Sequence, residues 1–538
     1  MGSLEGRYSS SYAGNVAEFR GAGNFGSFTG PGVVLRRCFV FGVRCPVGPA
    51  RCPVRGLLHG VRFSGKSPLI PPMIRYSLSL AAALAAALPL ASQKPPQPDW
   101  NALGEETVRT MSDYLKINTT NPPGNELQGA LFLKGILERE GFEVQILDTA
   151  ELGKGRANLY ARLKGDGSKK AIALVHHIDV VPSDLRYWTV DPFSGATRDG
   201  FLYGRGALDM KGEGIVHLMA MLALKRSGVP LTRDIVFIAN TDEELASTGA
   251  LVFVDRHADL LKDVEFLFTE GGGNPIRDGK LEYYGIGVAE KRTFWQHLTV
   301  KGTPSHGSRP TRQNPVPRLV RALSKIANFE TPLHVTAGVQ KYFRDISRNY
   351  TGERRTWLAN VRAATAIPRA RAWLTSDVYW NAILRNTISL TVLNGSNKTN
   401  VIPAEATAEV DIRLLPDQDP ERVLADLQRA VNDTAVKWRS LIQPKVPLEN
   451  PTDTDLFRAI ERAAHERDPA ALVTTPMLTG ATDRPTYRKL GIITYGISPF
   501  KVPVEDSQKG VHGNDERISV ENIGFGVRFL YDVLRYAQ

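Results

Sequence analysis

The sequence predicts an α/β fold, in which a three-layer domain built on a central, twisted, mostly parallel sheet carries an inserted α+β domain. Three apolar segments, at residues 171–175, 235–239 and 265–269, are rich in β-branched and aromatic residues. Such continuous runs are typical of strands that helices cover on both faces. The helix–strand rhythm changes near residue 291, which indicates a second module. A chain of 538 residues is also too long for a single hydrophobic core, so we expect at least two domains.

The larger domain begins after a proline-rich linker at residues 94–98. Apolar spacing predicts helices at 102–115, 126–140 and 212–226, and strands at 143–147 and 158–163. This alternation favours a sheet that is mostly parallel and covered by helices on both faces. Residues 94–291 are therefore assigned to the first part of this domain.

The inserted domain is predicted from a different pattern, strand, helix, strand, strand, which favours a ferredoxin-like module. The pattern comprises strands at 293–300, 387–393 and 406–414 and a helix at 315–328, and it places the domain at residues 292–411. The Arg-rich, partly helical stretch at 331–386 fits neither pattern. The first pattern then returns, with predicted helices at 421–436, 454–466 and 520–536 and a strand at 492–496. Residues 412–538 thus complete the larger domain.

A segment at residues 73–93 has the shape of a signal peptide. Met73 and Arg75 precede an apolar stretch from Leu78 to Leu90, and small residues follow it, as at a cleavage site. The stretch is shorter than the roughly 20 residues that span a bilayer, so we expect no stable membrane span. The protein is expected to be exported, either periplasmic or secreted. Residues 1–72 are then either a non-native extension before the true start or a disordered leader.

The positive charge and the cysteines both belong to this leader. Residues 1–93 hold ten Arg and Lys against two Glu, a balance of +8, which leaves +3 of the total +11 for the rest of the chain. That remainder indicates no nucleic-acid partner. Cys38, Cys45 and Cys52 are the three cysteines of the chain. Residues 94–538 therefore contain neither a cysteine nucleophile nor a disulfide.

Polar residues with metal-binding side chains follow the apolar strands. His177 follows the first strand, the pair Glu243 and Glu244 follows the second, and Glu270 follows the third. Asp209 opens a predicted helix, and His512 lies near the C-terminus. Ligands collect beyond the carboxyl ends of parallel strands. Carboxylates that converge there would repel one another unless cations were present, so the sequence predicts a metal site.

Residues next to these candidate ligands indicate which side chains would orient a ligand and which would accept a proton. Asp179 lies two residues after His177, on the same face of an extended segment, where a carboxylate can orient a ligand histidine. Of the two adjacent glutamates, one can bind metal while the other takes a proton from metal-bound water. Asp209 lies in a glycine-rich loop, residues 204–212, whose spacing departs from a dinucleotide-binding loop.

These motifs, His-x-Asp, Gly-Arg-Gly-x-x-Asp-Met-Lys-Gly, Asp-Glu-Glu, a single Glu and a C-terminal His, resemble the zinc-dependent family that includes aminoacylases, carboxypeptidases and succinyl-diaminopimelate desuccinylases. The resemblance covers roughly residues 100–538. It implies two Zn²⁺ ions per subunit, with Co²⁺ or Mn²⁺ as substitutes. One would be held by His177, Asp209 and Glu270, and the other by Asp209, Glu244 and His512. Glu243 would be the general base and Asp179 would orient His177.

The resemblance also extends to the inserted domain. Residues 305–308 resemble a lid in which a histidine, here His306, stabilises the oxyanion, often in the site of the neighbouring subunit of a dimer. Asn400 and Arg413 resemble substrate-side residues of the lid, although Arg413 could instead pair with Asp411. The remaining substrate-side candidates, which resemble an aminoacylase segment, are Thr482, Asp483 and Arg484. The arginine stands one position earlier than in that segment, and proline occupies its place.

We expect hydrolysis of an amide beside a free carboxylate, in a dipeptide, at a C-terminal peptide bond or in an N-acyl amino acid. One alternative is a deacylase of another small amide, in which Arg413 would not contact the substrate. Another is an inactive binding protein on the same scaffold. The sequence contains no Gly-x-Ser-x-Gly, His-Glu-x-x-His or Pro-Cys-x-x-Cys, which argues against serine hydrolases, zincins and deaminases.

Overall fold

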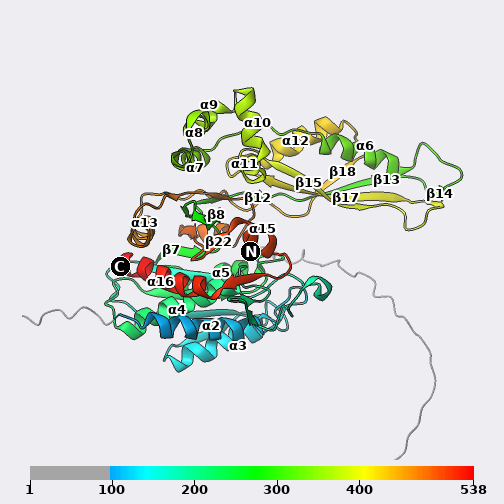
Figure 1. The fold of residues 1–538 in the computed structure, drawn as a ribbon. Coiled ribbons are helices and arrows are strands. Elements are labelled where there is room, and N and C mark those ends of the chain that lie inside the picture. The colour runs from blue at the N-terminus through cyan, green and yellow to red at the C-terminus, as the bar shows by residue number, and fades with distance from the viewer. Residues whose placement is uncertain (1–96) are drawn as a thin grey trace, which may run out of the picture. The chain divides into compact units, whose positions relative to one another are not determined.

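The computed structural model describes residues 97–538 (Figure 1). The predictions for the leader, residues 1–72 and 73–93, lie outside this range. Within residues 97–538, no helix combines the length and the apolar character that a membrane crossing requires.

The central sheet of the larger domain has six strands in the order β1-β2-β6-β3-β7-β21. Its strands are β1 (Val144–Leu147), β2 (Asn158–Leu163), β3 (Ala171–His177), β6 (Ile235–Asn240), β7 (Val264–Thr269) and β21 (Ile493–Gly496). β6, β3, β7 and β21 pair with one another in parallel fashion, whereas β2 pairs in antiparallel fashion with both β1 and β6. The predicted mostly parallel sheet is confirmed.

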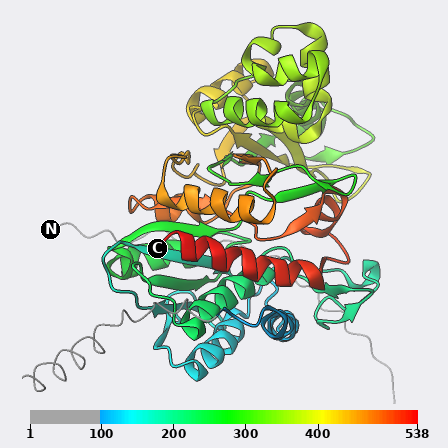
Figure 2. The same cartoon turned by 60° about the vertical axis from the view of Figure 1, so that its left-hand side comes forward.

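Helices cover both faces of this sheet, because its strands alternate apolar side chains between two cores. Leu174 and Phe237 belong to the core that contains α2 (Trp100–Leu115), α3 (Glu126–Arg139), α4 (Lys211–Ser227) and α16 (Val520–Tyr536). Val175 and Ile238 belong to the core that contains α5 (Thr248–His257) and α14 (Arg484–Arg488). α4 is buried along almost its whole length, because α2 and α16 pack on it. On its other side α16 contacts α13 (Asp455–Arg467), and Figure 2 shows these two helices side by side.

The inserted domain is an antiparallel sheet with two helices. Its order is β12-β17-β13-β18, with β15 also pairing with β17. The elements are β12 (Arg292–Thr293), β13 (Gln296–Lys301), α6 (Pro315–Ala327), β15 (Thr387–Asn394), β17 (Glu405–Leu414), α12 (Pro420–Val431) and β18 (Lys437–Ser440). The predicted end of this domain at residue 411 is too early, because β18 pairs with β13 and α12 packs on α6. The local pattern of α12 matches the larger domain, and only the strand pairing assigns it to the inserted one.

The stretch at 331–386, which the sequence did not place, forms a cluster of short helices that we call the helical insert. Figure 1 shows these helices beside the antiparallel sheet of the inserted domain, which we also call the lid domain. They are α7 (Ala337–Ile346), α8 (Gly352–Ala359), α9 (Val361–Ala364), α10 (Pro368–Ser376) and α11 (Val378–Ile383). The insert contacts the larger domain at residues 474–477, where Asp345 accepts a hydrogen bond from Thr474 Oγ1 and Tyr379 donates one to the Met477 carbonyl.

Short elements complete the described chain. They are β4 (Thr197–Arg198), β5 (Phe201–Tyr203), β8 (Asn274–Arg277), β9 (Lys280–Leu281), β10 (Tyr284–Gly285), β11 (Ala289–Glu290), β14 (Ser305–His306), β16 (Val401–Ile402), β19 (Val473–Thr474), β20 (Met477–Leu478), β22 (Lys501–Pro503), α15 (Val504–Gly510) and β23 (Arg517–Ser519), with single 3₁₀ turns at Leu185–Tyr187, Ala258–Leu261 and Ser347–Asn349.

Candidate metal centre

Three neighbouring parallel strands bring the predicted ligands to one edge of the sheet. β3 lies between β6 and β7, so His177 at the end of β3 lies beside the residues that follow those two strands. Glu243 and Glu244 come after β6, and Glu270 comes directly after β7. The arrangement follows from strand direction alone, because parallel strands end at the same edge.

Asp209 lies between the two ligand histidines. Its Oδ1 is 3.0 Å from Nε2 of His177, and its Oδ2 is 3.1 Å from Nε2 of His512. The same nitrogen of His512 lies 3.1 Å from Glu244 Oε2. Possible ligand atoms of His177, Glu243 and Glu270 lie within 4.8 Å of one another, as do those of His177, Asp209 and Glu244. The five predicted ligands therefore form one cluster, with Asp209 at its centre.

The electrostatics of this cluster call for cations. Burial, reinforced by neighbouring carboxylates, raises the pKa of Glu243 and of Glu270 well above its ordinary value. Hydrogen bonds to Asp209 and Glu244 raise the pKa of His512 to about 10. The buried Glu244 Oε1 has no hydrogen-bond partner among the described residues. A set of imidazole nitrogens and carboxylate oxygens matches the ligands that zinc prefers, so the residues present fit the metal that the sequence implies.

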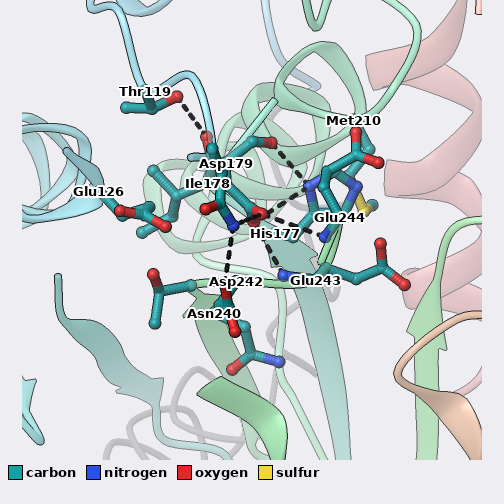
Figure 3. Close-up of polar contacts among 12 residues, drawn as sticks. Thr119, Glu126, His177, Ile178, Asp179, Met210, Asn240, Asp242, Glu243 and Glu244 are labelled. Carbon is teal, nitrogen blue, oxygen red and sulfur yellow. Dashed lines mark hydrogen bonds and ion pairs between the residues drawn. The ribbon is translucent and has the colours of Figure 1, made fainter. Parts of the chain in front are cut away.

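Asp179 holds both the histidine and the two glutamates (Figure 3). Its backbone carbonyl lies 2.9 Å from Nδ1 of His177, which leaves Nε2 of that ring free to face the cluster. Its carboxylate accepts hydrogen bonds from the backbone N–H groups of Glu243, at 3.0 Å, and of Glu244, at 3.1 Å. Asp179 thus positions three members of the site, although sequence reasoning gave it only the histidine.

Behind Asp179 lies a polar network that sequence reasoning missed. Asn121 Nδ2 donates to Asp179 Oδ2 at 2.9 Å and to Asp242 Oδ1 at 2.8 Å. Arg156 contacts the carboxylate of Asp242 and the side-chain oxygen of Asn121. Asp242 has a φ of +64°, and these contacts hold it in the left-handed turn that precedes Glu243. Asp242 is part of the Asp-Glu-Glu motif, whereas Asn121 and Arg156 carry no local signal.

Glu516 holds the loop that carries Asp209. Its carboxylate is buried and accepts hydrogen bonds from the backbone N–H groups of Gly206, Leu208 and Asp209, at 3.0, 2.7 and 3.0 Å. Arg205 pairs with the same carboxylate at 2.7 Å. Arg205 stands in the Gly-Arg-Gly motif, and Glu516 lies four residues after His512, so their positions beside predicted ligands could have indicated this role.

A cavity of about 1310 Å³ opens at this cluster of candidate ligands, which we call the metal cluster. Asp209, Glu243, Glu244, Glu270 and His512 all line it. Of the predicted substrate-side residues, Arg413 lines the cavity, while its guanidinium already contacts Asp411 Oδ1 at 2.8 Å and Thr293 Oγ1 at 3.0 Å.

The predicted substrate-side residues at positions 482–484 lie behind the surface of the cavity. Arg484 is fully buried and pairs with Glu290 at 2.9 Å, while Thr482 Oγ1 donates to the same carboxylate at 2.8 Å. Asp483 accepts a hydrogen bond from Asn240 at 3.0 Å. Among the described residues, Ala481 and Pro485 line the cavity but the three between them do not. The expectation that Arg484 faces the substrate is therefore not met, because its charge is taken up by Glu290.

His306 and Asn400 lie together, away from the metal cluster. β14, which contains His306, pairs with β16, and Gly307 N donates to the Asn400 carbonyl at 2.7 Å. His306 is exposed, and its Nδ1 lies 2.7 Å from Ser308 Oγ. Neither residue is among the described residues that line the cavity.

Comparison with known proteins identifies the family of the chain. Residues 173–536 match the family described as Peptidase family M20/M25/M40. The chain belongs to this family. As a member of the M20 family it is an enzyme of the metallopeptidase or amidohydrolase kind, which confirms the resemblance inferred from its motifs.

Relatives of the chain include enzymes with different names. The N-fatty-acyl-amino acid synthase/hydrolase PM20D1 of Xenopus tropicalis is 30% identical, over 73% of this chain and 77% of the relative. The probable carboxypeptidase S-like 2 of Dictyostelium discoideum is 28% identical, over 69% of this chain and 73% of the relative. The crystal structure of the M20 family metallo-carboxypeptidase Sso-CP2 from Sulfolobus solfataricus superposes with a TM-score of 0.63 at 19% identity, covering 80% of this chain and 99% of that one. This last likeness confirms the fold.

Proposed function

We propose that the chain is a dinuclear zinc hydrolase that cleaves an amide bond beside a free carboxylate, in an N-acyl amino acid or a short peptide. The observation that carries the proposal is the position of Asp209 between His177 and His512, at 3.0 and 3.1 Å, with Glu243 on the same cavity wall. The names of the relatives, which include a hydrolase of N-fatty-acyl amino acids and a carboxypeptidase, support this class of substrate.

The ligands divide between two ions. His177, Asp209 and Glu270 would hold one, and Asp209, Glu244 and His512 the other. When bound, such ions polarise the scissile carbonyl and lower the pKa of water toward neutrality. Asp179 and Glu516 keep the ligand loops in place through the hydrogen bonds described above.

Glu243 is the proposed general base and later the general acid. It lines the cavity, and burial together with the charge of Glu270 raises its pKa above that of a free carboxyl group. A shift in this direction makes the carboxylate a stronger proton acceptor. It would take a proton from the attacking water and deliver it to the leaving amine.

Two cations are candidates for the substrate carboxylate. Arg413 lines the cavity, as does Lys445, whose Nζ donates to Ser247 Oγ at 2.8 Å and to the Thr482 carbonyl at 2.9 Å. The existing pair of Arg413 with Asp411 favours a second candidate function, in which the enzyme deacylates an amide without a carboxylate and Arg413 only supports the lid.

The decisive experiment is an assay of the purified chain against a panel of dipeptides, N-acyl amino acids and simple amides, combined with metal analysis. Glu243→Gln is expected to lower kcat/KM by at least about 100-fold on the best substrate, with its metal content retained. Unchanged turnover in this variant would refute the role of Glu243. Equal turnover of amides with and without the carboxylate would favour the second candidate.

A further inference from the structure

The cavity is larger than the proposed chemistry requires. Small-molecule pockets usually occupy about 300–1,000 Å³, whereas this one reaches about 1310 Å³. The additional wall comes from the helical insert, which contributes five aromatic side chains to the lining. They are Tyr342, Tyr350, Trp373, Tyr379 and Trp380.

These rings form a continuous packed surface. Trp373 and Trp380 lie edge to face with their centroids 5.3 Å apart, and Tyr350 lies 6.0 and 6.1 Å from the same two rings. Tyr342 contacts Tyr379 in the same manner, at 6.1 Å. Ring pairs of this geometry are rigid and favourable, so the wall is preformed.

The wall is continuous with the metal cluster through two segments that line the same cavity. Residues 271–273 lead from Glu270 toward β8, and residues 476–481 run past the insert, where Tyr379 donates to the Met477 carbonyl at 3.0 Å. Gly272 has a φ of +71°, and a Cβ there would lie 2.3 Å from the Gly285 carbonyl. The first segment therefore keeps its tight turn and leaves the cavity open beside Glu270.

The chemistry of the wall favours an apolar occupant without polar backbone. The helices of the insert hydrogen-bond their own backbone groups, and the Tyr379 hydroxyl is already bonded. Burial raises the pKa of Tyr342 and of Tyr379 well above its ordinary value, so both rings stay neutral. Asp377 caps α11 through the Trp380 N–H at 2.8 Å, and Arg354 lies over the Trp373 ring, with its Cζ 5.1 Å from the centroid. A peptide would leave N–H and C=O groups unpaired against this wall, which is costly.

We propose that the helical insert forms the acyl-group pocket of this enzyme, and that the pocket selects amides with a long hydrocarbon acyl group. The assignment rests on the proposed function for the reaction, and it adds the residues that set the acyl preference. These are Tyr342, Trp373, Val378, Tyr379 and Trp380.

The first test compares N-acetyl, N-octanoyl and N-dodecanoyl derivatives of one amino acid as substrates of the full chain. Each buried methylene favours binding, so kcat/KM is expected to rise by at least about tenfold from acetyl to dodecanoyl. Val378 is the first residue of α11, lines the cavity and is 86% exposed. Val378→Asp therefore places a charge at the rim of the cavity without disturbing the fold. It is expected to lower the dodecanoyl value by at least about tenfold and the acetyl value by less than about threefold. Trp373→Ala should act in the same direction.

Ile367→Asp is the matched control. Ile367 is an exposed apolar residue at the N-cap position of α10, in the same insert, and is absent from the described lining of the cavity. Its variant is expected to match the wild type on all three substrates. A wild type without chain-length preference, or equal effects of Val378→Asp and Ile367→Asp, would overturn the assignment.

Binding of dodecanoate, followed by tryptophan fluorescence, separates this inference from the proposed function. Saturable binding that Val378→Asp weakens by at least about tenfold and Ile367→Asp leaves unchanged would support the pocket, even if no amide in the series were hydrolysed. Such a lack of hydrolysis would refute the proposed function alone. Absence of dodecanoate binding to the wild type would overturn the pocket.

Discussion

Individual residues at this centre act through backbone hydrogen bonds as much as through the metal cluster. Asp179 accepts the N–H groups of Glu243 and Glu244, and Glu516 accepts those of three residues in the Asp209 loop. A buried carboxylate that accepts several N–H groups fixes the loop that donates them. The positions of the predicted ligands therefore depend on carboxylates that are not among the predicted ligands themselves.

The role of Asn121 as a positioning residue can be tested. Asn121→Ala removes the donor that links Asp179 to Asp242, so the turn before Glu243 should loosen. We expect kcat to fall about 10- to 100-fold while KM changes little, and zinc content measured by mass spectrometry to stay near the wild-type value. Asn101→Ala, at an exposed position of α2, is the control. An unchanged kcat in Asn121→Ala would contradict this role.

At the scale of elements, α4 shows how one helix serves both the core and the site. Its N-terminus follows Asp209, and its remaining turns are buried between the sheet and the helices α2 and α16. His217 lies in this buried part, 1% exposed, and its Nδ1 has no partner among the described residues. It is a packed histidine and belongs to neither of the candidate metal-binding groups.

Burial of His217 makes the fold sensitive to acid. Burial lowers the pKa of His217 from 6.5 to about 3, so between these values the unfolded chain binds a proton that the folded chain does not. Stability from this group is complete above pH 6.5 and is lost as pH falls, by about 1.4 kcal/mol per pH unit. His217→Leu is expected to flatten this part of the pH dependence, measured as urea midpoints between pH 7.5 and 4.5. An equally steep loss in the variant would contradict the assignment.

At the scale of the whole molecule, the position of His306 bears on assembly. The residue is exposed on the lid and lies outside the described lining of the cavity of its own chain. We propose that it acts in the site of a second copy of the chain, in a homodimer formed through the lid domain, where its imidazole would donate a hydrogen bond to the developing oxyanion.

A mixing experiment tests this arrangement. Glu243→Gln and His306→Ala are each expected to be nearly inactive. If His306 acts in the partner, refolding an equal mixture restores roughly a quarter of wild-type activity, since half of the dimers then hold one complete site. Recovery of no activity from two inactive variants would place His306 in the site of its own chain, and an active His306→Ala variant would place it outside the reaction.

Removal of metal should affect the whole larger domain. Without cations, Asp209, Glu243, Glu244 and Glu270 repel one another in a buried site. Treatment with a chelator is expected to abolish turnover and to lower Tm, and two equivalents of Zn²⁺ should restore both. A Tm that does not respond to the metal would contradict binding of zinc by this cluster.

The sequence alone predicted the fold class of the larger domain and the five candidate ligands that the structure brings into one cluster. This was feasible because the ligands follow three buried strands, and parallel strands end at one edge of the sheet. The sequence therefore brought His177, Glu243, Glu244 and Glu270 together before any contact was known, and its motifs named Asp209 and His512.

Only the tertiary structure decided the substrate side of the site. Arg484 stands in a motif that suggests a substrate contact, yet it is buried against Glu290, more than 190 positions earlier in the chain. Asn121 and Arg156 support Asp179 and Asp242 without any local pattern, and the helical insert lines the cavity although its sequence fits neither domain. The candidate ligands follow the ends of parallel strands, so a local pattern is enough to bring them together. The shape of the cavity comes from packing between segments that are remote in sequence, and no local pattern predicts it.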